Sequence, residues 1–211
     1  MKKQVVLTIT LVLFSLLIFG MQNGEYMFKL LNQEAATETA SFKQVSTDVV
    51  NFESTTDLHF QMQHAVYQTK GQIKDNLIVD YQLSVLYNNS ETVIHCTLND
   101  DILTYTINNV GKDIPIEGPL LILDNNLAWS WQLVYNLYHE NGYEAINVFI
   151  PQLLLKNFTE ILPLEIQKTT QTEEDTNVFF SYNGQSGMLK VDENHQVFQL
   201  LMGGTQMEKT K

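Results

Sequence analysis

The chain has 211 residues, a single cysteine, no arginine and a formal net charge of −12. Nucleic-acid binding normally needs a basic face, and arginine is the usual bidentate reader of phosphate, so this composition excludes nucleic acid as an expected partner. The acidic excess also argues against adhesion of a folded domain to anionic lipid head groups. Any role at a membrane should therefore depend on apolar contacts.

Residues 1–22 have the layout of a signal peptide or a membrane anchor. Lys2 and Lys3 precede an apolar run from Val5 to Met21. As a helix, this run is somewhat shorter than a hydrocarbon core of roughly 30 Å, so its length fits either a cleaved signal or a short anchor. Small residues that would mark a cleavage site are scarce after the run, which favours an anchor. A buried core helix is a further alternative, which the absence of a polar face disfavours.

The lysines before this run predict which side of the membrane the rest of the chain occupies. Basic flanking residues stay in the cytoplasm, so the chain after the run should be extracytoplasmic. We expect a stalk or linker at residues 23–54, because that stretch is weakly patterned. One β-rich extracytoplasmic domain should follow at residues 55–203, with a polar tail at residues 204–211.

From Thr56 onward the dominant hydrophobic period is two, and the sequence is rich in Val, Ile, Thr, Tyr and Phe, as half-buried strands are. Clusters of Asn and Asp separate the alternating stretches and favour hairpin turns. The expected strands before the middle of the chain are Asp57–Gln63, Leu77–Tyr87, Thr92–Leu98 and Ile102–Asn108, and residues 112–123 are expected to form an edge strand or a crossing loop. Such short spacing predicts an antiparallel meander.

One segment has helical spacing instead. Asp124 is placed to cap a helix over Asn125–His139, and Asn141-Gly142 supplies a left-handed stop. Strands are then expected to resume at Tyr143–Ile150, Phe158–Lys168, Asn177–Tyr182, Gly187–Val191 and Gln196–Met202. Asn183-Gly184 and Asp192-Glu193-Asn194 are expected to form hairpin turns between the last three of these strands. The fold class is therefore mainly β, a β-rich α+β fold: a curved antiparallel sheet or half-barrel with one inserted helix, plus the N-terminal hydrophobic helix.

The motifs do not predict an enzyme, a metal site or a cofactor. His139-Glu140 resembles the start of a zinc-protease helix, but Tyr143 occupies the position where the second histidine would have to lie. His95 and Cys96 are neighbours on an expected strand, so their side chains point to opposite faces and cannot form a nucleophile–base pair. Cys96 is expected to be a buried thiol. Catalytic and metal residues are therefore predicted to be none, and cofactors none.

The expected helix carries a wide aromatic surface formed by Trp129, Trp131, Tyr135 and Tyr138. Two interpretations are open. The rings can pack into the core against the sheet, or they can line a groove that holds an apolar ligand or a partner. These four residues are the candidate ligand-binding residues.

The order of elements resembles that of the LolA/LppX-like envelope proteins: an exported leader, antiparallel strands, an inserted helical segment at Asp124–Gly142, then more strands. The resemblance is one of layout over residues 55–202, with no motif matched residue by residue. It implies a curved, incomplete β-barrel with an apolar concavity that binds acyl chains or lipoproteins. The lid of the LolA carriers is latched through an arginine, which this chain lacks.

Two functions follow as expectations. The first is a non-enzymatic extracytoplasmic binding module for an apolar small molecule or lipid in the bacterial cell envelope, with an apolar cavity between the concave sheet face and the helix. The alternative is a structural or interaction protein, membrane-anchored through its N-terminal segment, that docks another envelope protein. A hydrolase is disfavoured because no nucleophile, base and orienting group converge.

Overall fold

The computed structural model describes residues 21–60, 63–88, 90–124, 127–172 and 174–210. The first half of this part consists of β1 (Gly24–Leu30), β2 (Gln33–Gln44), β3 (Val49–Phe60), β4 (Gln63–Lys74), β5 (Leu77–Tyr87), β6 (Ser90–Asn99), β7 (Ile102–Ile107), β8 (Val110–Pro115) and β9 (Leu120–Ile122). The second half consists of α2 (Ser130–Asn141), β10 (Ala145–Phe149), the 3-10 helix η1 (Pro151–Lys156), β11 (Leu162–Gln171), β12 (Thr176–Tyr182), β13 (Gln185–Val191), β14 (Val197–Met202) and β15 (Thr205–Lys209).

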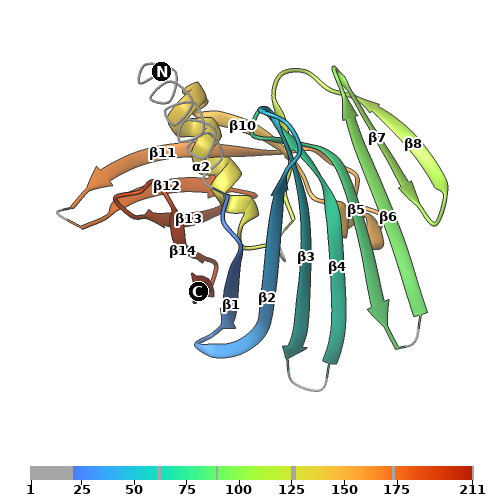
Figure 1. Cartoon of the computed structure of the whole chain (residues 1–211), viewed down its shortest axis with the longest axis horizontal. Helices are drawn as coiled ribbons and strands as arrows, with labels where there is room; N and C mark the ends of the chain where they lie inside the picture. The colour runs from blue at the N-terminus through green and yellow to red at the C-terminus, as the bar shows by residue number, and fades with distance from the viewer. Residues whose placement is uncertain (1–20, 61–62, 89, 125–126, 173, 211) are drawn as a thin grey trace, which may run out of the picture.

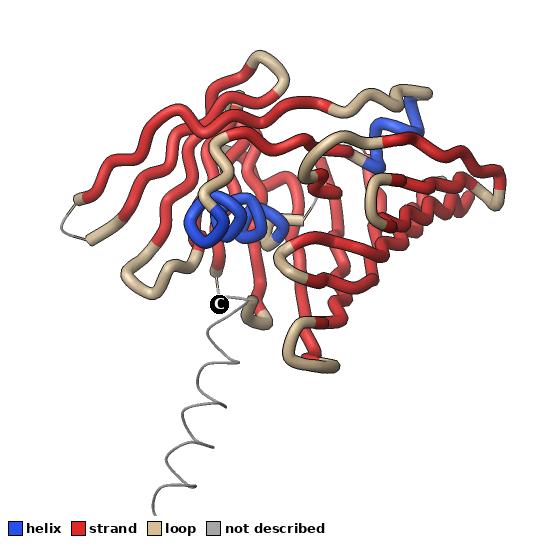
Figure 2. Tube along the Cα trace, turned by 90° about the horizontal axis from the view of Figure 1, so that it is seen from above, coloured by secondary structure: helices blue, strands red, loops and turns tan. Residues whose placement is uncertain are grey.

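These strands form a single sheet of 15 strands in the order β8-β7-β6-β5-β4-β3-β2-β1-β15-β14-β13-β12-β11-β10-β9. Neighbours pair antiparallel except β9 and β10, which are parallel. Strands β2 to β6 run along one direction and β11 to β13 along a steeply inclined one, so the sheet bends (Figure 1). Seen from above, α2 lies in the hollow between these two wings (Figure 2). The expected fold, a curved antiparallel sheet with one inserted helix, is confirmed.

Tight turns set the register of the meander. Both central residues of several two-residue turns have positive φ, which is the signature of type I′ hairpins and matches the twist of the strands they join. Asn and Gly tolerate this conformation best. These turns are Leu31–Asn32, Asp75–Asn76, Asn108–Asn109, Asn183–Gly184 and Gly203–Gly204. The hairpin predicted at Asn183-Gly184 is therefore confirmed.

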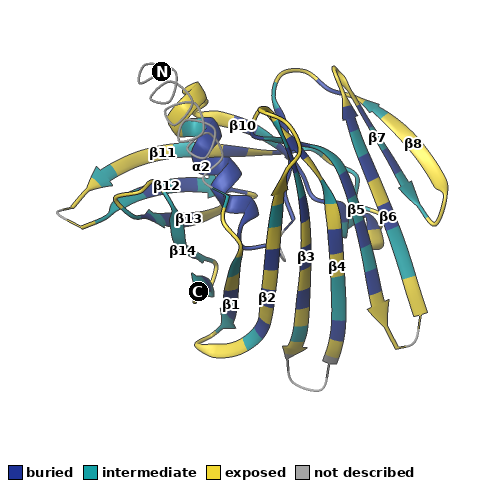
Figure 3. Ribbon diagram, in the orientation of Figure 1, coloured by how far each residue is buried: buried dark blue, intermediate teal, exposed yellow. Residues whose placement is uncertain are grey.

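Burial alternates along the long strands, as Figure 3 shows for β2 to β5. On β5, for example, Tyr81 and Leu83 are fully buried while Gln82 between them is only half-buried. The buried set faces the hollow and the other set faces outward. Cys96 on β6 is a buried free thiol, and His95 beside it is exposed. The predicted opposite orientation of these two side chains is confirmed.

The stalk predicted at residues 23–54 is wrong, because this stretch forms β1, β2 and half of β3 inside the sheet. Its inward-facing positions on β2 are Ala36, Glu38 and Ala40, all buried. Two small residues and an acid give no hydrophobic alternation, so the sequence pattern hid the strand. Backbone pairing with β1 and β3 over its length holds it in place.

The polar tail predicted at residues 204–211 is also wrong, because Thr205–Lys209 forms β15 between β14 and β1. Its one strongly apolar residue, Met207, is buried opposite Phe28. The first and last strands of the described part are thus neighbours, and their pairing joins the two wings of the sheet. A short strand with a single apolar contact carries too weak a pattern to be predicted.

The inserted helix begins later than expected. It starts at Ser130, preceded by Trp129, and no side chain caps its first turn. Asp124, the predicted cap, is fully buried and accepts hydrogen bonds from Tyr81 Oη and Gln152 Nε2 instead. The predicted stop is confirmed, since Gly142 has a φ of 72° and its N–H bonds back to the last turn.

The N-terminal hydrophobic helix, whether signal peptide or anchor, falls on residues 1–20 and lies outside the described residues. Within the described ranges, no helix combines the length and apolar character that crossing a membrane requires.

Candidate functional site

Two of the four predicted ligand-binding residues belong to the core. Trp129 is 2 % exposed and its ring lies 4.7 Å from that of Phe52 and 5.2 Å from that of Phe42. Trp131 is 1 % exposed, with its ring 5.1 Å from that of Phe180. These rings, from both wings of the sheet, fill the space between α2 and the concave face. The apolar cavity expected there is therefore occupied by the chain's own side chains.

The other two residues lie further along the helix. Tyr138 is half-buried, and its Oη shares a 2.8 Å hydrogen bond with Thr169 Oγ1 on β11. Tyr135 is buried, and its Oη shares a 2.9 Å hydrogen bond with His195 Nδ1 in the β13–β14 turn. Tyr135 lines a cleft at the C-terminal end of α2.

This cleft, which we call the α2-end cleft, has a volume of about 540 Å³. Four segments wall it: the last turns of α2, the β13–β14 turn, β14 with β15, and the residues just before β1. Its apolar and aromatic wall consists of Met21, Tyr135, His139, His195 and Phe198. Its polar wall consists of Gln22, Asn136, Glu140, Asp192, Asn194, Gln196 and Lys209. A volume of a few hundred cubic ångströms with rings and a few convergent polar groups is typical of small-molecule sites.

Three rings form a continuous stack along the cleft. Tyr135 and His139 are one helical turn apart, so their rings lie on the same face of α2, with centroids 5.2 Å apart and nearly parallel planes. The ring of His195 lies 4.6 Å from that of His139. His195 reaches this position because its backbone adopts a left-handed φ of 61° at the β13–β14 turn. Tyr135 is almost fully buried within this stack, so His139 and His195 present its exposed ring surface to the cleft.

Buried amides fix the cleft to the sheet. Gln132 Nε2 donates to the His195 carbonyl oxygen at 2.9 Å, and Gln132 Oε1 accepts from the Val197 N–H at 2.7 Å. Asn76 Nδ2, in the β4–β5 turn, donates to Glu140 Oε2 at 2.8 Å. Asn76 Oδ1 in turn accepts from Asn136 Nδ2 at 3.0 Å. Side chains held in this way are preorganised and lose little freedom when a ligand binds.

The α2-end cleft is electronegative. Glu140 and Asp192 contribute two carboxylates, whereas Lys209 is the one lysine among the lining residues. Burial raises the pKa of Tyr135 to about 12, and the charges of Glu140 and Asp192 raise it in the same direction. The C-terminal end of a helix adds a partial negative charge. A cation is therefore favoured over an anion in this cleft.

The opposite end of α2 is fastened by a buried acid, Glu38. Glu38 Oε2 accepts from the Ala128 N–H at 2.7 Å, and Ser54 Oγ donates to Glu38 Oε1 at 2.6 Å. Burial raises the pKa of Glu38 to about 8; its two hydrogen bonds oppose this shift and the charge of Asp124 adds to it. These contacts tie the chain before α2 to β2 and β3. We assign them a structural role, because both Glu38 and Ser54 are buried.

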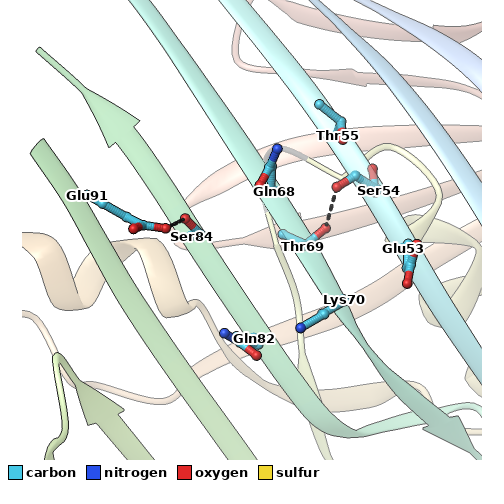
Figure 4. A pocket seen from close by; sticks show the side chains of 9 residues that line it. All are labelled: Glu53, Ser54, Thr55, Gln68, Thr69, Lys70, Gln82, Ser84 and Glu91. Atoms are coloured by element: carbon cyan, nitrogen blue, oxygen red, sulfur yellow. Dashed lines mark hydrogen bonds between the residues drawn. The ribbon is translucent and has the colours of Figure 1, made fainter. Parts of the chain in front are cut away.

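A second hollow, of about 470 Å³, lies on the outward face of β3 to β6. Figure 4 shows its labelled side chains, which are hydroxyl, amide and charged groups spread across neighbouring strands. Ser84 Oγ donates to Glu91 Oε1 at 2.5 Å, and Thr69 Oγ1 lies 3.5 Å from the Ser54 carbonyl oxygen. No aromatic ring lines this hollow, so it offers hydrogen bonds without an apolar surface.

Two histidines that the sequence analysis left unassigned face each other across β3 and β4. His59 and His64 are direct cross-strand partners. His64 Nε2 lies 2.9 Å from Asp57 Oδ1, and His59 Nε2 lies 3.4 Å from Glu34 Oε1. In the described part of the chain, no three histidine, cysteine or acidic side chains are arranged to hold a metal ion.

The sequence analysis missed most of the α2-end cleft. His195, Asp192 and Phe198 come from a hairpin that is distant from α2 in the sequence: His195 lies 60 residues after its hydrogen-bond partner Tyr135. Only the predicted hairpin at Asp192–Asn194 indicated that this segment would form a turn. Nothing in its composition showed that the turn would lie against the helix.

The fold and the cleft together define a mainly β protein whose curved sheet holds a helix and leaves a ligand-sized cleft at the end of that helix. No family model and no curated protein matches the chain. Among solved structures, it is similar to the crystal structure of a DUF1089 family protein from Pseudomonas aeruginosa. The TM-score is 0.51, with 13 % identity over 76 % of this chain and 87 % of that chain. At this identity the likeness shows a shared fold.

Proposed function

We propose that this protein is a non-enzymatic binding protein of the bacterial cell envelope that holds an amphipathic small molecule or lipid in the α2-end cleft. The observation that carries this proposal is the cleft itself, a hollow of about 540 Å³ that combines a stack of three rings with hydrogen-bonding groups. The ligand's apolar part would lie against Phe198 and the rings, and its polar part against the amides and charges.

The place of the cleft supports an envelope role. Two residues that line it lie at the end of the apolar run that the sequence analysis interprets as a signal peptide or anchor: Met21 is the last residue of the run and Gln22 follows it. If that run is retained in a membrane, the cleft opens close to the lipid surface, where an amphipathic ligand would be encountered. The layout shared with the LolA/LppX-like proteins is consistent with this role, although the ligand would lie at the helix end instead of in the sheet's hollow.

Binding can be tested with the purified full-length chain and the neutral dye N-phenylnaphthylamine, whose fluorescence rises in apolar surroundings. Phe198→Glu places a charge in the cleft, and Leu155→Glu places the same charge on an exposed apolar residue of η1, outside the cleft. We expect Phe198→Glu to lose the signal and co-purified lipid, as detected by mass spectrometry, while Leu155→Glu keeps both. Equal binding by all three proteins would refute the proposal.

The cellular compartment of the protein is tested separately, with a reporter fused after Lys211. An extracytoplasmic reporter should be active and a cytoplasm-only reporter inactive. The reverse result would refute a function in the cell envelope, and the ligand of the cleft would then have to be sought in the cytoplasm.

A second function has one observation in its favour. The concave face is filled by the chain's own side chains, and β8 is an edge strand on which Val110 is 77 % exposed. An envelope protein that docks a partner, anchored through its N-terminal segment, needs an accessible edge or surface of this kind. A chain that binds no dye but captures a partner strand along β8 would favour this function.

A further inference from the structure

We infer that the α2-end cleft selects a ligand whose polar group is an ammonium cation. This inference rests on the proposed function and specifies the chemistry of that site. Three features of the cleft lead to it: the balance of charge among its lining residues, the stack of rings, and the orientation of α2.

The charge balance is the first feature. The residues that line the cleft include two carboxylates, Glu140 and Asp192, and one lysine, Lys209. The Lys209 ammonium already donates a hydrogen bond, since its Nζ lies 3.4 Å from Gln22 Oε1. The sequence contains no arginine, the residue that most often binds phosphate or carboxylate bidentately. An anionic head group would meet repulsion from two carboxylates with a single cation to offset it.

The rings are the second feature. Cations bind over the faces of aromatic side chains, and cages of rings with nearby carboxylates are the usual sites for quaternary ammonium groups. Tyr135 lies in a stack with His139 and His195, and Glu140 follows His139 directly in the chain. The stack and the carboxylate therefore line the same cleft, as an ammonium group requires.

The orientation of α2 is the third feature. Asn136, His139 and Glu140 of its last two turns line the cleft, so the negative end of the helix dipole lies at the site. The bond from Asn76 Nδ2 holds the Glu140 carboxylate in position before any ligand arrives. Glu140 and Asp192 also add to the rise that burial causes in the pKa of Tyr135.

The test uses the full-length chain in nanodiscs and ligand-detected NMR, with three hexyl compounds that differ in the polar group: hexyltrimethylammonium, hexanol and hexanoate. Empty nanodiscs give the background. We expect hexyltrimethylammonium to bind about fivefold or more tightly than hexanoate, since a charge pair near a protein surface is worth at least this much.

Two variants distinguish the effect of a carboxylate in the cleft from the effect of the chain's overall negative charge. Glu140→Gln removes one charge and keeps an oxygen for the Asn76 bond, and it should reduce the preference several-fold. Glu165→Gln removes a charge on exposed β11, outside the cleft, and should leave the preference unchanged. Thermal unfolding of each variant checks that the fold is kept.

Each outcome decides a different point. Equal or tighter binding of hexanoate, or an unchanged preference in Glu140→Gln, would overturn the ammonium inference and leave the proposed function standing. Absence of binding by all three compounds would overturn both. The final probe is tetramethylammonium, which has no hexyl tail. If it bound as tightly as hexyltrimethylammonium, ammonium recognition would be supported, and the ligand would be a small ammonium compound instead of a lipid.

Discussion

The two ends of α2 differ in what surrounds them, although they belong to one short helix. From Ser130 to Leu137 every residue is buried, and the chain just before this stretch is fastened to β2 and β3 through Glu38. From His139 onward the residues are exposed, and the helix becomes one wall of a cleft. Figure 3 shows this change of burial along the helix.

Core packing and the candidate ligand site are therefore separated along the helix axis. A curved sheet can enclose only as much of a helix as its strands span, and the remainder must face solvent or a ligand. Substitutions at the enclosed end should therefore change stability, and those at the open end should change binding.

Trp131→Ala should destabilise the protein by about 3–5 kcal/mol, because it removes a large, fully buried side chain from the centre of the core. Trp131→Phe should be much milder, since Trp131 Nε1 has no hydrogen-bond partner among the described residues and ring packing is what holds it. Urea unfolding of both variants measures the difference. A near-neutral alanine variant would contradict the assignment of this end to the core.

Glu38 should make stability depend on pH. Its pKa is raised from 4.5 to about 8 in the folded chain, so between these values the folded state holds a proton that the unfolded state releases. The free energy of unfolding must then fall as pH rises through this interval, and the stabilisation is fully present below it. Urea unfolding at a series of pH values measures this slope.

Glu38→Gln should flatten that slope while keeping an oxygen acceptor for Ala128 N–H. The matched control is Glu165→Gln on exposed β11, for which we expect the wild-type slope. If Glu38→Gln kept the wild-type dependence of unfolding free energy on pH, protonation of Glu38 would not be the cause of that dependence.

Tyr135→Phe should have the smallest effect on stability, about 1 kcal/mol or less, because it removes one hydrogen bond, that to His195, and keeps the ring. Dye binding should nevertheless weaken, since the β13–β14 turn loses a contact that positions His195. Tyr138→Phe is the control: it removes the bond to Thr169, outside the cleft, and should leave binding unchanged. Equal effects of both variants on binding would contradict the separation.

Prediction from the sequence worked best where local chemistry decides the structure. The alternation of β5 and β6, the turn at Asn183-Gly184 and the stop at Gly142 are all properties of a few adjacent residues. Prediction was wrong where a strand depends on distant partners. β2 carries Ala36, Glu38 and Ala40 on its inner side, and only the position of α2 explains an acid there.

A mainly β fold with one inserted helix follows from the amino-acid sequence, because periodicity and turn residues act over short distances. The shortage of cations on which the ligand inference depends is likewise a property of the composition. Long-range contacts account for the remaining features: Asp124 is buried instead of capping a helix, Trp129 and Trp131 fill the hollow, and His195 stacks on His139. These contacts join segments far apart in the chain, and their formation depends on how the sheet bends, which no local pattern records.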